Sequence, residues 1–92
     1  MNLTMKARKT LNEKILLNEI SVYCATMANF WNNKTDEMYQ NSKQGIYTII
    51  ALMVFYMKKS EEQLLNYARK ELNKYVIGDG NKVDYSIVCN EI

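Results

Sequence analysis

The segment Ile46-Tyr47-Thr48-Ile49-Ile50-Ala51-Leu52-Met53-Val54-Phe55-Tyr56-Met57 decides the fold of this protein. It carries no charged residue, and its length without turn residues favours a helix over a buried strand. A helix that is apolar all round must be covered all round, and each large apolar side chain left in water forgoes about 1.5–3 kcal/mol. The segment therefore predicts a homodimer or a larger closed oligomer with this helix at the interface. The alternative is a monomer whose other elements wrap the helix completely.

Helices are also predicted on both sides of this segment. Residues 10–32 begin with Thr10 and Glu13 at the spacing of a capping box, and their apolar residues then recur at helical intervals. This apolar stripe consists of Leu16, Ile20, Tyr23, Met27, Phe30 and Trp31. Residues 61–75 follow Ser60 in a second capping box and show the same periodicity.

The second helix is the least regular of the three. Thr35 is predicted to cap it at its N-terminus. Residues 41–45 then favour a kink or a short break, although they also fit a polar stretch within one helix, where Gly45 would cost about 1 kcal/mol. The sequence therefore predicts a mainly α fold, a three-helix bundle whose second helix is either continuous or kinked and split.

The C-terminal part of the chain differs from the rest and predicts a β-hairpin over residues 75–89. Asp79-Gly80 is a strong turn signal, and apolar residues at 83, 85 and 87 alternate with polar ones. Two strands alone are marginal in water, so the hairpin would pack on the helices or pair with another chain.

Length and charge indicate a single domain over residues 1–92, with 10–75 helical. The net charge is only +2, but the basic residues are concentrated near the N-terminus. Residues 1–9 are interpreted as a basic arm or as an extension of the first helix. Lys6, Arg8 and Lys9 would steer an acidic partner or a phosphate, unless they serve only solubility.

The sequence shows no recognisable catalytic chemistry. It lacks histidine, which removes His-based acid–base catalysis and nearly every zinc site, and its two cysteines form no metal motif. The acidic residues lie at caps, in first turns and on solvated faces, and no phosphate-binding loop is present. We therefore expect no enzymatic activity, no metal and no cofactor. No apolar run reaches the roughly 18 residues of a membrane span, so we expect a cytoplasmic protein without a membrane partner.

Ten aromatic residues, seven of them tyrosine, favour contacts with other proteins. Phe30, Trp31 and Tyr39 are predicted to anchor a partner beside the turn after the first helix, unless Phe30 and Trp31 lie in the core under that turn. Three residues of the apolar segment are predicted to line the self-association face, namely Tyr47, Val54 and Tyr56.

These features favour a small cytosolic protein-binding module, a homo-oligomeric regulator or inhibitor of a bacterial target protein. The 11 asparagines and 10 lysines suggest an AT-rich coding bias, which is typical of phages and mobile elements of low-GC bacteria. The alternative is a small winged-helix-like regulator that binds DNA, with the hairpin as its wing. Acidic residues at the start of helix 61–75 and the modest net charge argue against DNA binding.

Overall fold

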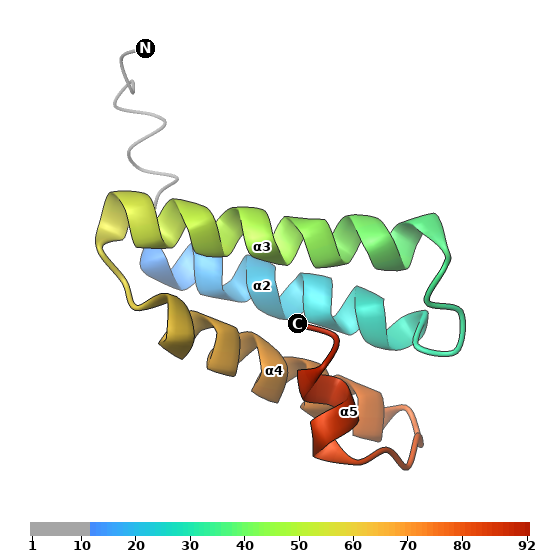
Figure 1. Ribbon diagram of the computed structural model, residues 1–92. Helices are drawn as coiled ribbons and strands as arrows, with labels where there is room; N and C mark the ends of the chain where they lie inside the picture. Colours follow the sequence, from blue (N-terminus) through green and yellow to red (C-terminus); the bar gives the residue numbers. More distant parts are fainter. Residues whose placement is uncertain (1–11) are drawn as a thin grey trace.

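The computed structural model describes residues 12–92, which form four helices and no strand (Figure 1). The helices are α2 (Glu13–Asn29), α3 (Glu37–Met57), α4 (Glu61–Gly78) and the short α5 (Tyr85–Cys89). The predicted mainly α class is therefore confirmed for this part of the chain. The three long helices pack side by side, with α2 in contact with both α3 and α4 along their length.

The first helix begins and ends inside its predicted limits. Asn12 caps α2, and its side-chain oxygen accepts hydrogen bonds from the backbone N–H groups two and three residues on, at 2.9 and 3.3 Å. The predicted cap at Thr10 lies outside the described residues. The helix ends at Asn29, slightly before its predicted end, because the chain then turns over residues 30–36 toward α3.

The predicted kink or break at residues 41–45 is absent, and α3 is one continuous helix. Its N-cap is Asp36 rather than Thr35, and the Asp36 carboxylate accepts a hydrogen bond from the backbone N–H of Met38 at 2.8 Å. At the other end Lys58 takes the left-handed conformation with φ 57°, which ends the helix. The polar stretch therefore interrupts the apolar pattern of α3 without interrupting the helix.

Gly45 has a packing role in this helix instead of a bending role. A Cβ atom at this position would lie 2.7 Å from two ring atoms of Tyr23 on α2, closer than real Cβ contacts. Glycine costs a helix interior about 1 kcal/mol relative to alanine. The close approach between α3 and the Tyr23 ring explains why glycine occupies position 45 although alanine would favour the helix.

The effect of Gly45→Ala is expected to depend on Tyr23. In the wild-type protein the added methyl group forces the half-buried Tyr23 ring to move, and such overpacking costs about 1–3 kcal/mol. In a Tyr23→Ala background the same change should raise the free energy of unfolding by about 1 kcal/mol, because only helix propensity then changes. Urea unfolding of the four proteins measures this coupling. Equal effects of Gly45→Ala in both backgrounds would show that Tyr23 is not the residue that requires glycine.

The third helix confirms its predicted cap. The Ser60 hydroxyl accepts a hydrogen bond from the backbone N–H of Gln63 at 3.3 Å, and the helix begins at the next residue after Ser60. The helix then continues to Gly78, beyond the predicted end at Tyr75.

The predicted β-hairpin over residues 75–89 is wrong. Residues 75–78 belong to α4. Val76 is fully buried there, on the face that carries the other core residues of that helix. Gly80, with φ +86°, lies in the turn that follows. Asp84 then caps α5, accepting a hydrogen bond from the backbone N–H of Ser86 at 3.0 Å, which lowers the pKa of its carboxyl group. The alternating pattern of residues 83–87 favours a strand, but an isolated two-stranded hairpin with no sheet to join is only marginally stable. The helical conformation is favoured instead, because it buries Val76 on α4 and is capped by Asp84 on α5.

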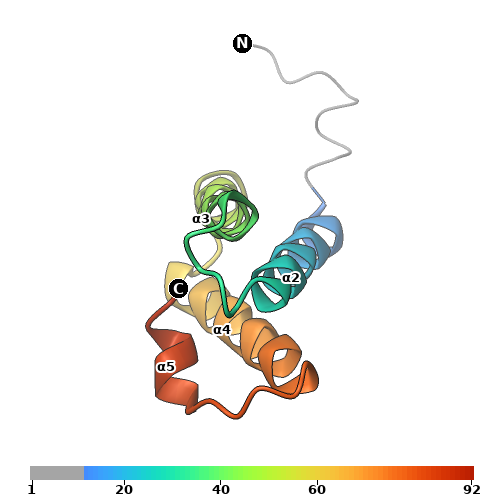
Figure 2. The ribbon, with the colours of Figure 1, turned by 90° about the vertical axis from the view of Figure 1, so that its right-hand side faces the viewer.

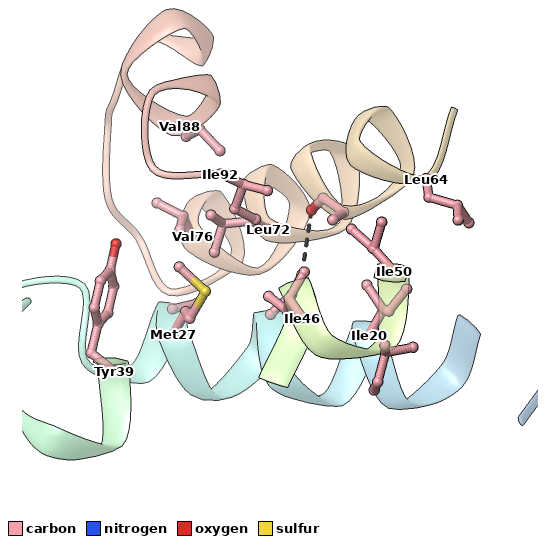
Figure 3. Packing of buried hydrophobic residues seen from close by; sticks show 14 of the residues in the cluster. Ile20, Met27, Tyr39, Ile46, Ile50, Leu64, Leu72, Val76, Val88 and Ile92 are labelled. Atoms are coloured by element: carbon pink, nitrogen blue, oxygen red, sulfur yellow. Dashed lines mark hydrogen bonds between the residues drawn. The ribbon is translucent and has the colours of Figure 1, made fainter. Parts of the chain in front are cut away.

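The core fills the space between the three long helices (Figure 3). Seen along the bundle, α2 lies on one side of the α3–α4 pair, and α5 and the C-terminus lie on the other (Figure 2). The buried hydrophobic residues are Leu16, Ile20, Cys24, Met27, Ala28, Trp31, Tyr39, Ile46, Ile49, Ile50, Met53, Leu64, Ala68, Leu72, Val76, Val88 and Ile92.

Candidate functional site

An apolar groove lies between α3 and α4, and we call it the α3–α4 groove. Its volume is about 910 Å³. From α4 it is lined by Glu61 and Leu65, and Ile92 contributes from the C-terminal segment. The rest of the lining comes from α3 and consists of Tyr47, Thr48, Ile50, Ala51, Leu52, Val54, Phe55 and Tyr56. Glu61 is the one charged residue of this lining, so the groove offers an apolar surface with almost no fixed charge.

The groove is apolar because α3 carries apolar residues on several faces, and the rest of the chain covers only some of these faces. Ile46 and Met53 face the core and are fully buried. Farther round the helix, Tyr47 and Val54 are half-buried. Phe55 and Tyr56, by contrast, are 67% and 49% exposed. This agrees with the expectation that helix 46–57 is covered only in part by its own chain.

The two exposed aromatic side chains form an ordered pair at the edge of the groove. Phe55 and Tyr56 meet edge to face, with ring centroids 4.9 Å apart and an interplanar angle of 81°. The Lys58 ammonium lies 5.6 Å from the centroid of the Phe55 ring and donates a hydrogen bond to the Phe55 carbonyl oxygen at 3.1 Å. Contacts within the chain therefore hold Phe55 in position while leaving most of its ring in water.

The C-terminal segment occupies the other part of the gap between α3 and α4 (Figures 2 and 3). Glu91 accepts a hydrogen bond from the Tyr39 hydroxyl, and its carboxylate lies 3.8 Å from the Lys34 ammonium. The Arg69 guanidinium donates to the carbonyl oxygen of Ile92 at 3.3 Å, and the Ile92 side chain is buried. Burial, and then the hydrogen bond to Glu91, raise the pKa of Tyr39 well above its usual value. These polar contacts hold Ile92 in place as part of the groove lining.

Comparison of the chain with models of known protein families, with curated proteins and with solved structures found no match. Within residues 12–92, no group of three His, Cys, Asp or Glu side chains is placed to hold a metal ion. No helix in this same range combines the length and the apolar character that crossing a membrane requires.

The structure brings together all three residues that the sequence assigned to self-association. Tyr47, Val54 and Tyr56 line the same groove. The sequence interpretation missed Phe55, the most exposed of the large hydrophobic residues, and Leu65, which faces α3 from α4. The spacing of Phe55 from Thr48 and Ala51 along one helix face would have indicated it. The contribution of Leu65 depends on how α4 packs and has no signal in the sequence.

The residues predicted to anchor a partner lie mostly in the core. Trp31 is 5% exposed and Tyr39 is fully buried, with ring centroids 6.5 Å apart, while Phe30 is half-buried and packs against the core. The Lys34 ammonium lies 4.0 Å from the centroid of the Trp31 ring and covers it from outside. Trp31 and Tyr39 therefore do not form an exposed anchor, and the burial of Trp31 corresponds to the core alternative.

The sequence also predicts a basic arm, or an extension of the first helix, over residues 1–9. Lys6, Arg8 and Lys9 lie outside the described residues 12–92. Their role in steering an acidic partner or a phosphate stays a prediction.

A part-buried polar cluster joins α2 to α4 on another side of the bundle. The Ser21 hydroxyl donates to the Glu71 carboxylate at 2.8 Å and lies 2.9 Å from the Tyr75 hydroxyl, while the Lys74 ammonium lies 3.2 Å from the Glu71 carboxylate. Burial, with a smaller contribution from the Glu71 charge, raises the pKa of the nearby Cys24 thiol to about 12. This thiol therefore stays protonated at neutral pH and is a poor nucleophile. The cluster is suited to linking two helices, because each of its polar groups already has a partner within the chain.

Proposed function

We propose that this protein is a small protein-binding module that forms a homodimer through the α3–α4 groove. The observation that carries this proposal is the exposure of Phe55 and Tyr56 beside an apolar groove of about 910 Å³. Covering a large apolar side chain contributes about 1.5–3 kcal/mol. In a symmetric dimer both copies gain this contribution, so a few such residues support association.

A second copy of the chain fits the groove because the groove carries almost no charge. A two-fold interface brings the same patch of both subunits together, so a charged patch would face its own charge. No residue from 46 to 57 is charged, and Glu61 is the one acidic residue of the lining. Self-pairing of residues 46–57 therefore buries apolar surface without placing charges of this segment against each other.

The proposed dimer regulates or inhibits a bacterial target protein in the cytoplasm and is encoded by a phage or a mobile element. The asparagine- and lysine-rich composition supports the origin. Of the exposed hydrophobic residues outside the groove, three lie near one another in the chain, at the end of α4 and on α5, and they support binding of a target: Ile77, Tyr85 and Ile87. A target bound there should lose affinity on Ile87→Lys and keep it on Phe55→Lys.

The winged-helix alternative lacks support from the fold. It required residues 75–89 to form a β-hairpin that could act as a wing, and these residues are helical or lie in a turn.

Phe55→Lys is expected to convert the dimer into a monomer. The change removes an apolar side chain from both halves of the interface and brings two charges into it, so the dimer Kd should rise about 100-fold or more. Because Phe55 is 67% exposed, the fold of the subunit should be preserved. Light scattering at micromolar concentration in 0.15 M salt should give twice 10.8 kDa for the wild type and 10.8 kDa for the variant.

Val22→Lys is the matched control for this experiment. Val22 is 50% exposed, but it lies on α2, which packs on the side of the α3–α4 pair opposite the C-terminal segment. This variant should keep the wild-type mass. A wild-type protein that is monomeric under the same conditions would contradict the proposed homodimer, and so would a dimer that survives Phe55→Lys unchanged.

A further inference from the structure

We infer that in the proposed homodimer the two α3 helices run antiparallel and cross at Ala51, so that Phe55 of each copy packs on Tyr47 of the partner subunit. This inference rests on the proposed self-association and specifies its geometry. It identifies the occupant of the groove as α3 of a second copy.

The exposed face of α3 has the residue spacing of a helix-pairing seam. Gln44, Thr48, Ala51 and Phe55 are all exposed and follow one another at intervals of four, three and four residues. Residues at these intervals lie on one face of a helix, and a stripe of this kind can lie along a partner helix. The stripe is uncharged, and its last three members also line the α3–α4 groove. A helix lying along the stripe would therefore also fill the groove.

Ala51 is the position where two such helices can approach most closely. Packed helices lie 8–10 Å apart, and the distance depends on the size of the side chains at the contact. Ala51 has the smallest side chain of the exposed stripe and lies between the small Thr48 and the bulky Phe55. A crossing at Ala51 lets the two backbones come close while each Phe55 ring extends past the crossing point.

The antiparallel register then determines what each Phe55 ring meets. A two-fold axis at Ala51 places the residue four positions after it opposite the residue four positions before it, which pairs Phe55 with Tyr47 of the partner subunit. Tyr47 is half-buried and lines the groove. Aromatic rings at 4.5–7 Å between centroids attract each other beyond the gain from burial alone. The interface thus contains this aromatic pair twice, once on each side of the crossing.

A parallel arrangement fits the same surface less well. It would place each residue opposite its own copy, so that Lys58 would face Lys58 and the dipoles of the two helices would point the same way. In the antiparallel arrangement the two helix dipoles oppose each other, and Lys58, seven positions after Ala51, lies level with the uncharged Gln44 of the partner subunit. The helix dipoles thus favour the antiparallel pair.

Cysteine cross-linking tests this geometry directly. In a Cys89→Ser background, Ala51→Cys places two thiols at the crossing point, where Cα atoms can reach the 4.4–6.8 Å that a disulfide needs. Mild oxidation followed by non-reducing electrophoresis should show a covalent dimer of Ala51→Cys. Thr48→Cys is the matched control, because antiparallel pairing separates the two copies of this position by six residues, about 9 Å along the helix. Cross-linking of Thr48→Cys should be at least tenfold slower.

The outcomes separate this inference from the proposed homodimer. If both variants cross-link at similar rates, the helices pair in parallel and the inference is overturned. If light scattering shows a dimer but Ala51→Cys does not cross-link, the homodimer stands and the α3 crossing is overturned. If the wild-type protein is monomeric, both proposals fail together.

Discussion

Ile20→Ala is expected to lower the free energy of unfolding by about 2–5 kcal/mol. Ile20 is fully buried on α2, the helix that contacts both α3 and α4. Shortening its side chain leaves a cavity that three packed helices can close only in part. Because domains of this size are stable by about 5–15 kcal/mol, the loss is a large share of the total. Urea unfolding followed by far-UV circular dichroism measures it.

Ile15→Ala provides a control with the same chemical change on the same helix. Ile15 is 51% exposed, so its truncation should change the free energy of unfolding by no more than about 0.5 kcal/mol. A loss at Ile15 as large as that at Ile20 would contradict the assignment of the buried face of α2.

The protein is also expected to lose stability as the pH rises from about 9 to about 12. Burial raises the pKa of Cys24 from 9.0 to about 12, so within this range the unfolded chain releases a proton that the folded chain retains. The folded state is then favoured fully below pH 9, and this contribution is lost as the pH rises toward 12. A shift of this size corresponds to roughly 4 kcal/mol. Burial also raises the pKa of Tyr39 and of Tyr67, which adds to the loss in the same direction.

A comparison of two cysteine variants isolates the contribution of Cys24. Urea unfolding at pH 8 and pH 11 should show a smaller loss of stability for Cys24→Ala than for the wild type. Cys89→Ala retains Cys24 and should therefore show the full loss. If Cys24→Ala loses as much stability between these pH values as the wild type, the buried thiol is not responsible for the alkaline effect.

The helices could be predicted from local sequence because their signals are local. The Ser60 cap lies next to the helix it starts, and the periodic apolar residues of α2 and α4 mark their buried faces without reference to the rest of the fold. The prediction was wrong where a local signal competed with packing. The alternating residues after Gly80 suggested a strand, but Val88 is fully buried on a short helix instead. Gly45 suggested a break, but it makes room for a ring on another helix.

The candidate site was predictable in part for the same reason. An uncharged helix in a small chain indicates that some of its surface stays exposed, and Tyr47, Val54 and Tyr56 follow from that helix alone. The contributions of Leu65 and Ile92 require knowledge of where α4 and the C-terminal segment lie. The burial of Trp31, which the sequence left open, is likewise a result of packing.

The sequence by itself determined that this chain is mainly helical and that its middle helix is uncharged and apolar on every side, because hydrophobicity and helical periodicity are properties of the residues themselves. The tertiary structure decided which face of that helix stays open. α2 covers one side, α4 and the C-terminal segment cover part of another, and the stripe from Thr48 to Phe55 is left in contact with water. That choice depends on how close the helices approach one another, which is set by contacts between residues far apart in the chain.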